Sequence, residues 1–133
     1  MGFASNIISI SQFTLPYLSR PITNSLSSPV LFLVFNRPKT TRLVFERIKT
    51  AKPKQLFIAA DGPRIGNKDD ERLCAEVREI INQVDWPCET KTLYRKDNLG
   101  CKLAVFQAIS WFFENVEDGI IIEAESATYD KKE

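Results

Sequence analysis

Four short apolar segments alternate with three longer segments of helical periodicity in the part of the chain after residue 28. Residues 29–35 are an unbroken apolar run of strand length, and a run without alternation predicts a strand that is buried on both faces. Three further strands are predicted over residues 55–60, 88–94 and 119–123.

The segments between these strands predict helices over residues 39–51, 69–84 and 101–115. The first follows Pro38, which suits the first turn of a helix, and carries Leu43 on its apolar side. The last is strongly apolar and includes Leu103, Phe106 and an aromatic run at residues 111–113 that we expect in the core. The order β-α-β-α-β-α-β predicts an α/β fold with three α/β/α layers, right-handed crossovers and a mainly parallel four-stranded sheet.

The 133 residues suffice for one domain, and composition divides them into three parts. Residues 1–28 hold seven serines, one arginine and no acidic residue. That composition is typical of an organellar transit peptide, although a disordered leader is the simpler interpretation. Residues 29–125 are the predicted domain, and residues 126–133 are a polar tail.

Composition also excludes several classes of function. The net charge of +1 gives no basic surplus for binding nucleic acid, and no apolar run reaches the ~20 residues of a membrane-spanning helix. The chain has no histidine, which excludes Ser/His/Asp and Cys/His catalysis within it. Cys74, Cys88 and Cys101 have no Cys-x-x-Cys spacing, and we expect reduced thiols in a cytoplasmic protein.

Polar side chains follow every predicted strand, and ligands of open α/β sheets bind beyond the carboxyl ends of the strands. In chain order, the residues at these ends are Asn36 and Arg37; Asp61 and Gly62; residues 95–98 with Gly100; and Glu123 and Glu125. Such a rim could hold a sugar nucleotide. Aspartate would accept from base or ribose, basic residues would bind phosphates, and paired carboxylates would bind a divalent metal.

A structural role stays open for each of these residues. Asp61 and Gly62 are common turn residues, and Asp97 or Asn98 could cap the next helix. Two other nucleotide-binding classes are disfavoured, because the chain has neither Gly-x-Gly-x-x-Gly after the first strand nor a P-loop sequence.

Four short segments together resemble the bacterial family-two glycosyltransferases of the nucleotide-diphospho-sugar transferase superfamily. They are PVLFLVFNRP at residues 29–38, IAADGP at 58–63, NLGC at 98–101 and GIIIE at 119–123. The resemblance implies a GT-A fold that is truncated to its N-terminal, nucleotide-binding half. It also implies a nucleotide-sugar donor and an acceptor that the sequence does not identify.

The resemblance assigns roles to individual residues. It implies that Asn36 and Arg37 lie beside the nucleotide and that Asp61, with Gly62 in the same turn, recognises the base. The diphosphate and sugar side would be lined by Asn98 and Gly100, with Lys102 just beyond.

The fourth strand should lead into the family's metal motif, which typically reads Glu-Asp-Asp at this point. This chain reads Glu123-Ala124-Glu125 instead. We expect Mg²⁺ or Mn²⁺ at Glu123 and Glu125, where it would bridge the diphosphate and stabilise the leaving group.

The resemblance ends after Ser126, before the part that supplies the acceptor site and general base in the family. Two functions therefore stay open: a glycosyltransferase-type domain that binds its sugar donor, and a truncated, non-catalytic nucleotide-binding remnant or interaction module. The outer edge of the fourth strand is expected to be unpaired and apolar, which predicts self-association.

Overall fold

The computed structural model describes residues 26–124, which fold into four strands and three helices. Residues 1–25 of the expected leader, Glu125 and the expected tail at 126–133 lie outside the described residues. The elements in chain order are β1 (Val30–Val34), α2 (Pro38–Ala51), β2 (Gln55–Ala60), α3 (Lys68–Ile81), β3 (Glu89–Tyr94), α4 (Cys101–Asn115) and β4 (Ile120–Glu123).

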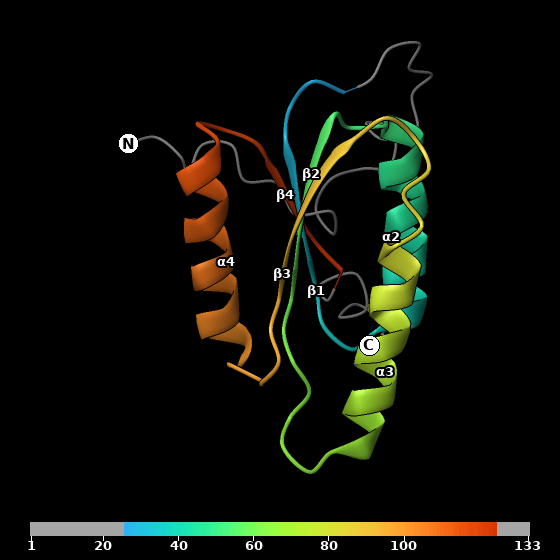
Figure 1. The fold of residues 1–133 in the computed structure, drawn as a ribbon, viewed down its shortest axis with the longest axis vertical. Helices are drawn as coiled ribbons and strands as arrows, with labels where there is room; N and C mark the ends of the chain where they lie inside the picture. Colours follow the sequence, from blue (N-terminus) through green and yellow to red (C-terminus); the bar gives the residue numbers. More distant parts are fainter. Residues whose placement is uncertain (1–25, 125–133) are drawn as a thin grey trace, which may run out of the picture.

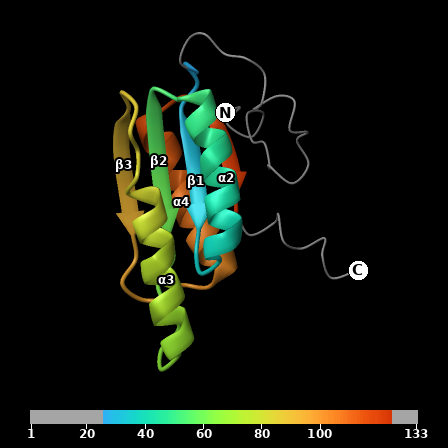
Figure 2. The same cartoon turned by 90° about the vertical axis from the view of Figure 1, so that its right-hand side faces the viewer.

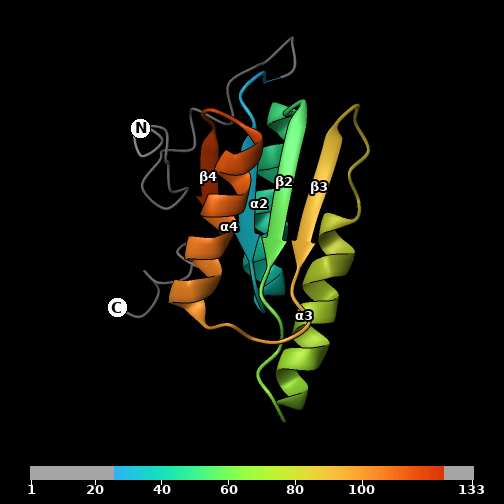
Figure 3. The same ribbon diagram turned by 60° about the vertical axis from the view of Figure 1, so that its left-hand side comes forward.

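The four strands form one parallel sheet in the order β3-β2-β1-β4, which confirms the predicted fold class. Strand β1 lies in the interior, where Phe32 is in register with Ile58 of β2 and Ile122 of β4. Helices α2 and α3 cover one face of the sheet, and α4 covers the other (Figure 1). Figure 2 shows the face with α2 and α3, and Figure 3 shows α4 in front of the opposite face.

Two apolar cores, one on each face, explain why β1 has no polar position. Val30, Phe32 and Val34 belong to the core under α2 and α3, whereas Leu31 and Leu33 belong to the core under α4. Successive side chains of a strand point to opposite faces, so a strand covered on both sides must be apolar throughout.

The end of α3 and the exposure of three apolar side chains differ from the sequence-based expectation. Helix α3 ends at Ile81 and not at residue 84. Beyond the helix, Trp86 turns back into the core and donates from Nε1 to the Pro53 carbonyl oxygen at 2.9 Å.

Leu43, Leu103 and Phe106 were expected on apolar helix faces, but they are 71%, 45% and 67% exposed. In α4 the buried face carries Ala108 and Phe112, four positions apart. At about 100° per residue, Leu103 and Phe106 point away from that face. Because α4 carries apolar residues on most of its sides, its sequence gives only a weak signal of which side packs on the sheet.

Strand β4 lies at the edge of the sheet, and within residues 26–124 it pairs with β1 alone. Its three isoleucine side chains are all buried: Ile120 and Ile122 on the α2 and α3 side, Ile121 on the α4 side. The edge therefore presents backbone groups and no apolar side-chain stripe.

Candidate functional site

The candidate site lies at the point in the sheet where the strands change sides: β2 and β3 lie on one side of β1, and β4 lies on the other. From β1 through β3 the chain adds strands on one side, and α4 then carries it back across the opposite face to β4 beside β1. Such a reversal leaves a crevice at the carboxyl ends of the strands, where ligands of open α/β sheets bind.

A cavity of about 330 Å³ occupies this edge of the sheet, beneath the first turns of α4. Small-molecule sites usually measure about 300–1,000 Å³, so the cavity suits a ligand fragment of modest size. Its apolar wall comes from the strand ends and α4: Leu33, Val34, Phe35, Ala59, Ala60, Leu93, Ala104 and Val105. Its polar and remaining lining residues are Asp61, Arg64, Arg95, Asn98, Gly100, Cys101 and Glu123.

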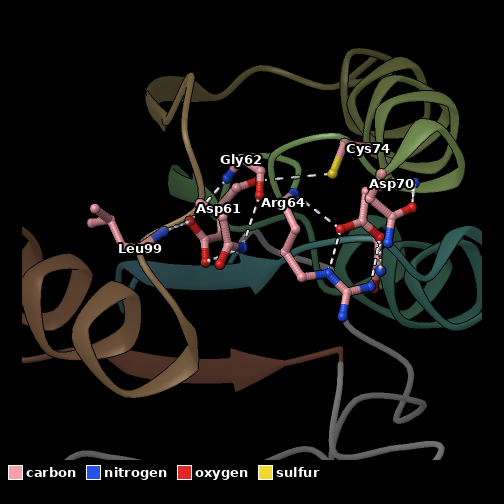
Figure 4. A network of polar contacts seen from close by, with 9 residues as sticks. Asp61, Gly62, Arg64, Asp70, Cys74 and Leu99 are labelled. Carbon is pink, nitrogen blue, oxygen red and sulfur yellow. Dashed lines mark hydrogen bonds and ion pairs between the residues drawn. The ribbon is translucent and has the colours of Figure 1, made fainter.

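Asp61 lies at the end of β2 and ties together the loops that follow β2 and β3. Its Oδ1 accepts from the backbone N–H groups of Gly62 and Leu99, both at 2.9 Å, and the carboxylate is buried (Figure 4). The side-chain amide of Asn98 donates to Asp61 Oδ2 at 3.1 Å and to the Gly62 carbonyl oxygen at 2.9 Å. These bonds hold the wall of the cavity in place.

Gly62 is required at its position by close approach of the two loops. A Cβ built there would lie 2.7 Å from backbone atoms of Lys96 and Asp97, closer than real Cβ atoms come. Gly100 precedes α4 with φ of 90°, a conformation that L side chains rarely adopt. Both glycines therefore shape the site through the backbone.

A second polar cluster lies next to Asp61 and centres on the buried Asp70 of α3, which is 1% exposed. Arg64 donates to both of its carboxylate oxygens, from Nε at 2.6 Å and from Nη2 at 2.9 Å (Figure 4). The Asn36 amide also donates to Asp70 Oδ1 at 2.9 Å. The hydrogen bonds from Arg64 hold the pKa of Asp70 well below its usual range, against the opposing effect of burial.

Arg78 of α3 fixes the ends of β2 and β3 relative to each other. Its Nη2 donates to the carbonyl oxygens of Asp61 at 3.2 Å and Arg95 at 2.8 Å, and its guanidinium lies 4.9 Å from the centre of the Tyr94 ring. Burial raises the pKa of the Tyr94 hydroxyl. Arg95 in turn donates from Nη2 to Gln107 of α4 at 2.7 Å.

Some of the expected site residues line the cavity, and the others lie outside it. Asp61, Asn98, Gly100 and Glu123 all line the cavity, and Gly62 is held against the same loop. Asn36 is bonded to Asp70, Arg37 is exposed before α2, and Lys102 lies in a shallow groove beside the cavity.

Only one of the two carboxylates expected at the metal, Glu123, belongs to the described residues. Glu125 lies outside residues 26–124, and within that range no three His, Cys, Asp or Glu side chains are grouped closely enough to hold a metal ion.

The three cysteines are free thiols, as expected. Cys74 is buried beneath Asp61, and burial raises its pKa to about 11. Burial also raises the pKa of Cys88. A thiol that stays protonated is a poor nucleophile, so Cys74 is a packing residue.

Sequence reasoning missed Arg64, Asp70 and Arg78. Asp70 stands among three acidic residues in the first turn of α3, where a carboxylate ordinarily complements the helix dipole from the surface. The Asn67 cap is a recognisable signal for the start of α3, because its side chain accepts from the Asp70 N–H. Nothing in the spacing shows that Arg64 folds back onto Asp70.

Comparison of the chain with protein-family models, curated proteins and solved structures found no match. Within residues 26–124, no helix combines the length and the apolar character needed to cross a membrane.

Proposed function

We propose that this chain binds a nucleotide-diphospho-sugar with its base in the cavity, as the donor-binding part of a glycosyltransferase-type domain. One observation carries the proposal: a mostly apolar cavity at the carboxyl edge of a parallel sheet has a buried, oriented carboxylate, Asp61, in its wall. Apolar pockets with a few fixed polar groups are the usual form of small-molecule sites.

The chemistry of the wall favours a nucleobase. A base has two flat apolar faces, which fit between the strand ends and the Ala104–Val105 side of α4. A carboxylate offers about four acceptor positions, and three are used by Gly62, Leu99 and Asn98. One position at Oδ2 is left for a ligand N–H.

That acceptor can take an N–H from any of the common bases. Uracil and guanine would donate a ring N–H to it, and cytosine and adenine would donate from their amino group. Uridine and guanosine diphosphate sugars are the first donors to test, because their ring N–H groups can point straight at Oδ2.

The sugar-bearing end of the ligand would extend towards the end of β4, where Glu123 lines the cavity. Glu123, with Glu125 beyond the described residues, would hold the Mg²⁺ or Mn²⁺ of such a donor site, and the ion would supply positive charge beside the diphosphate. A non-catalytic nucleotide-binding module is the alternative, and Ala124 favours it. This residue is buried, and its N–H donates to Leu33 at 3.1 Å, so the middle position of the motif extends the sheet.

Calorimetric titration with UDP- and GDP-sugars, each with and without Mn²⁺, tests both versions. Saturable binding whose affinity rises with Mn²⁺ supports a transferase donor site. Binding with the same affinity in the presence and absence of Mn²⁺ supports the non-catalytic module. Absence of binding at millimolar nucleotide sugar would rule out both.

Self-association through the edge of β4 is a separate part of the proposal. The free backbone groups of an edge strand can pair with a second chain. Light scattering at tens of micromolar protein is expected to report a mass above 15.2 kDa. A monomeric mass across that concentration range would remove this part and leave the ligand site untouched.

A further inference from the structure

We infer that Arg64 and Arg95 form an anion subsite at the cavity, which receives the diphosphate of the nucleotide. This inference rests on the proposed function for its ligand, but the subsite can be tested with an anion alone. The two arginines come from different loops, after β2 and after β3, and both line the cavity that holds Asp61.

Arg64 is held in one orientation by three contacts. Its Nε and Nη2 form a two-point bond with Asp70, its backbone N–H donates to the same carboxylate at 3.0 Å, and its guanidinium lies 5.9 Å from the centre of the Phe35 ring. A guanidinium has five N–H donors, and the bonds to Asp70 use two of them. The side chain is 58% exposed, so Nη1 and the second hydrogen of Nη2 are available to a ligand.

Arg95 is oriented by a hydrogen bond of its side chain, and among residues 26–124 it forms no ion pair with a carboxylate. Its Nη2 donates to the neutral amide of Gln107, and its carbonyl oxygen is bonded to Arg78. Four of its N–H donors remain after the Gln107 bond. Its charge is therefore available to an anion in the cavity.

Planar guanidinium groups that are held in advance suit phosphate oxygens, because less side-chain entropy is lost when the ligand binds. The cavity also contains the carboxylates of Asp61 and Glu123, so its own formal charges balance. An anion is then recognised by directed N–H donors and not by a long-range positive field. The subsite does not include Lys102, which was expected near the diphosphate but lies outside the cavity.

The test compares uridine with UDP, and guanosine with GDP, in the wild-type chain and in Arg64→Gln, Arg95→Gln and Lys102→Gln variants. Arg72→Gln is the matched control, because Arg72 is also paired with carboxylates and is 65% exposed, but it does not line the cavity. Arg64→Gln leaves a buried carboxylate without its ion pair. The double variant Arg64→Gln/Asp70→Asn removes that unpaired charge. Together with Arg95→Gln, it shows whether a loss of binding in Arg64→Gln comes from misfolding.

We expect the diphosphate to bind more tightly than the nucleoside, and each cavity arginine variant to reduce that ratio by about tenfold, with nucleoside affinity unchanged. Arg72→Gln should leave the ratio as it is. An unchanged ratio in both cavity variants, or a loss confined to Lys102→Gln, would overturn the subsite while the base site stands.

If neither nucleosides nor nucleotides bind, the proposed function fails and inorganic pyrophosphate decides the subsite alone. Pyrophosphate binding that is lost in both arginine variants supports the subsite. Pyrophosphate that does not bind the wild-type chain overturns it.

Discussion

Oδ1 of Asp61 accepts a hydrogen bond from the backbone N–H of Leu99 at 2.9 Å, across 38 positions of the chain. This bond joins the turn after β2 to the loop that opens α4, and both segments border the same cavity. The aspartate thus has a structural role whether or not it also binds a ligand, and the two roles have to be separated experimentally.

Replacing Asp61 with alanine should destabilise the fold by about 2–4 kcal/mol, because two backbone N–H groups and the Asn98 amide lose a charged acceptor. Urea unfolding monitored by tryptophan fluorescence measures this free energy. Asp97→Ala is the control, since Asp97 is exposed in the same loop and should change stability by less than about 0.5 kcal/mol. Equal stability of the two variants would show that the Asp61 bonds do not hold the loops.

Asn98→Ala separates structure from ligand binding. It removes one bond to Asp61 and one to Gly62 but leaves the carboxylate and its backbone donors in place. We expect a loss of about 1 kcal/mol in stability and retained nucleoside affinity. If Asn98→Ala abolished nucleoside binding in a folded protein, the base would be recognised by Asn98 and not by Asp61.

Asp70 makes stability depend on acidic pH. Its pKa in the folded chain is below the value of about 3.9 that aspartate has when unfolded. The stabilisation is therefore complete above the unfolded pKa and is lost as the pH falls through that value towards the folded one. The difference in urea midpoint between wild type and Asp70→Asn should be largest at pH 7, begin to shrink below about pH 4, and shrink further between pH 3 and pH 2. A difference that is constant from pH 7 to pH 2 would contradict the ion pair with Arg64.

Gly62→Ala tests the close approach of the two loops. The new Cβ would meet backbone atoms of Lys96 and Asp97 at 2.7 Å, so the loop must shift, at a cost of about 1–3 kcal/mol and with weaker ligand binding. Gly66→Ala is the comparison, because Gly66 has φ of 75° but no atom near its Cβ position. It should cost about 1–2 kcal/mol through backbone strain alone and leave ligand affinity unchanged. Identical ligand affinities in the two variants would exclude a role for loop contact in shaping the cavity.

Two phenylalanines of α4 should respond in opposite ways to truncation. Phe112 is fully buried and contacts Phe57 with ring centres 5.0 Å apart, so Phe112→Ala should cost about 3–5 kcal/mol. Phe106 is largely exposed, and Phe106→Ala should change stability by less than about 0.5 kcal/mol. Thermal unfolding of both variants measures the contrast, and a large loss in Phe106→Ala would mean that this side chain is covered in solution.

The sequence was sufficient to predict the elements and their parallel pairing, because strands that are buried on both faces leave unbroken apolar runs such as residues 30–34. The carboxyl-end rule also predicted that Asp61 and Asn98 would lie on one rim of the sheet, and in the structure they are hydrogen-bonded because β2 and β3 are adjacent. It could not predict which residue pairs form. Arg64 and Asp70 resemble ordinary surface charges until the loop between them folds back and buries the carboxylate.

The apolar pattern of the sequence also could not predict the order of the strands in the sheet. The position of β4 beside β1 depends on α4 crossing the face opposite to α2 and α3, and the strongly apolar sequence of α4 fits either face. That crossing creates the cavity, so the shape of the site could not be derived from the residues alone. The resemblance implied that Asn36, Arg37 and Lys102 lie at the ligand, but none of the three lines the cavity.

The measurement that tests the central claim most directly is an amide NMR titration of the wild-type chain with UDP and GDP. The account predicts saturable shifts concentrated at Gly62, Leu99, Gly100 and the first turn of α4, with little change at the amino ends of the strands. Shifts scattered over both faces of the sheet, or none at millimolar nucleotide, would contradict a nucleotide site at this edge.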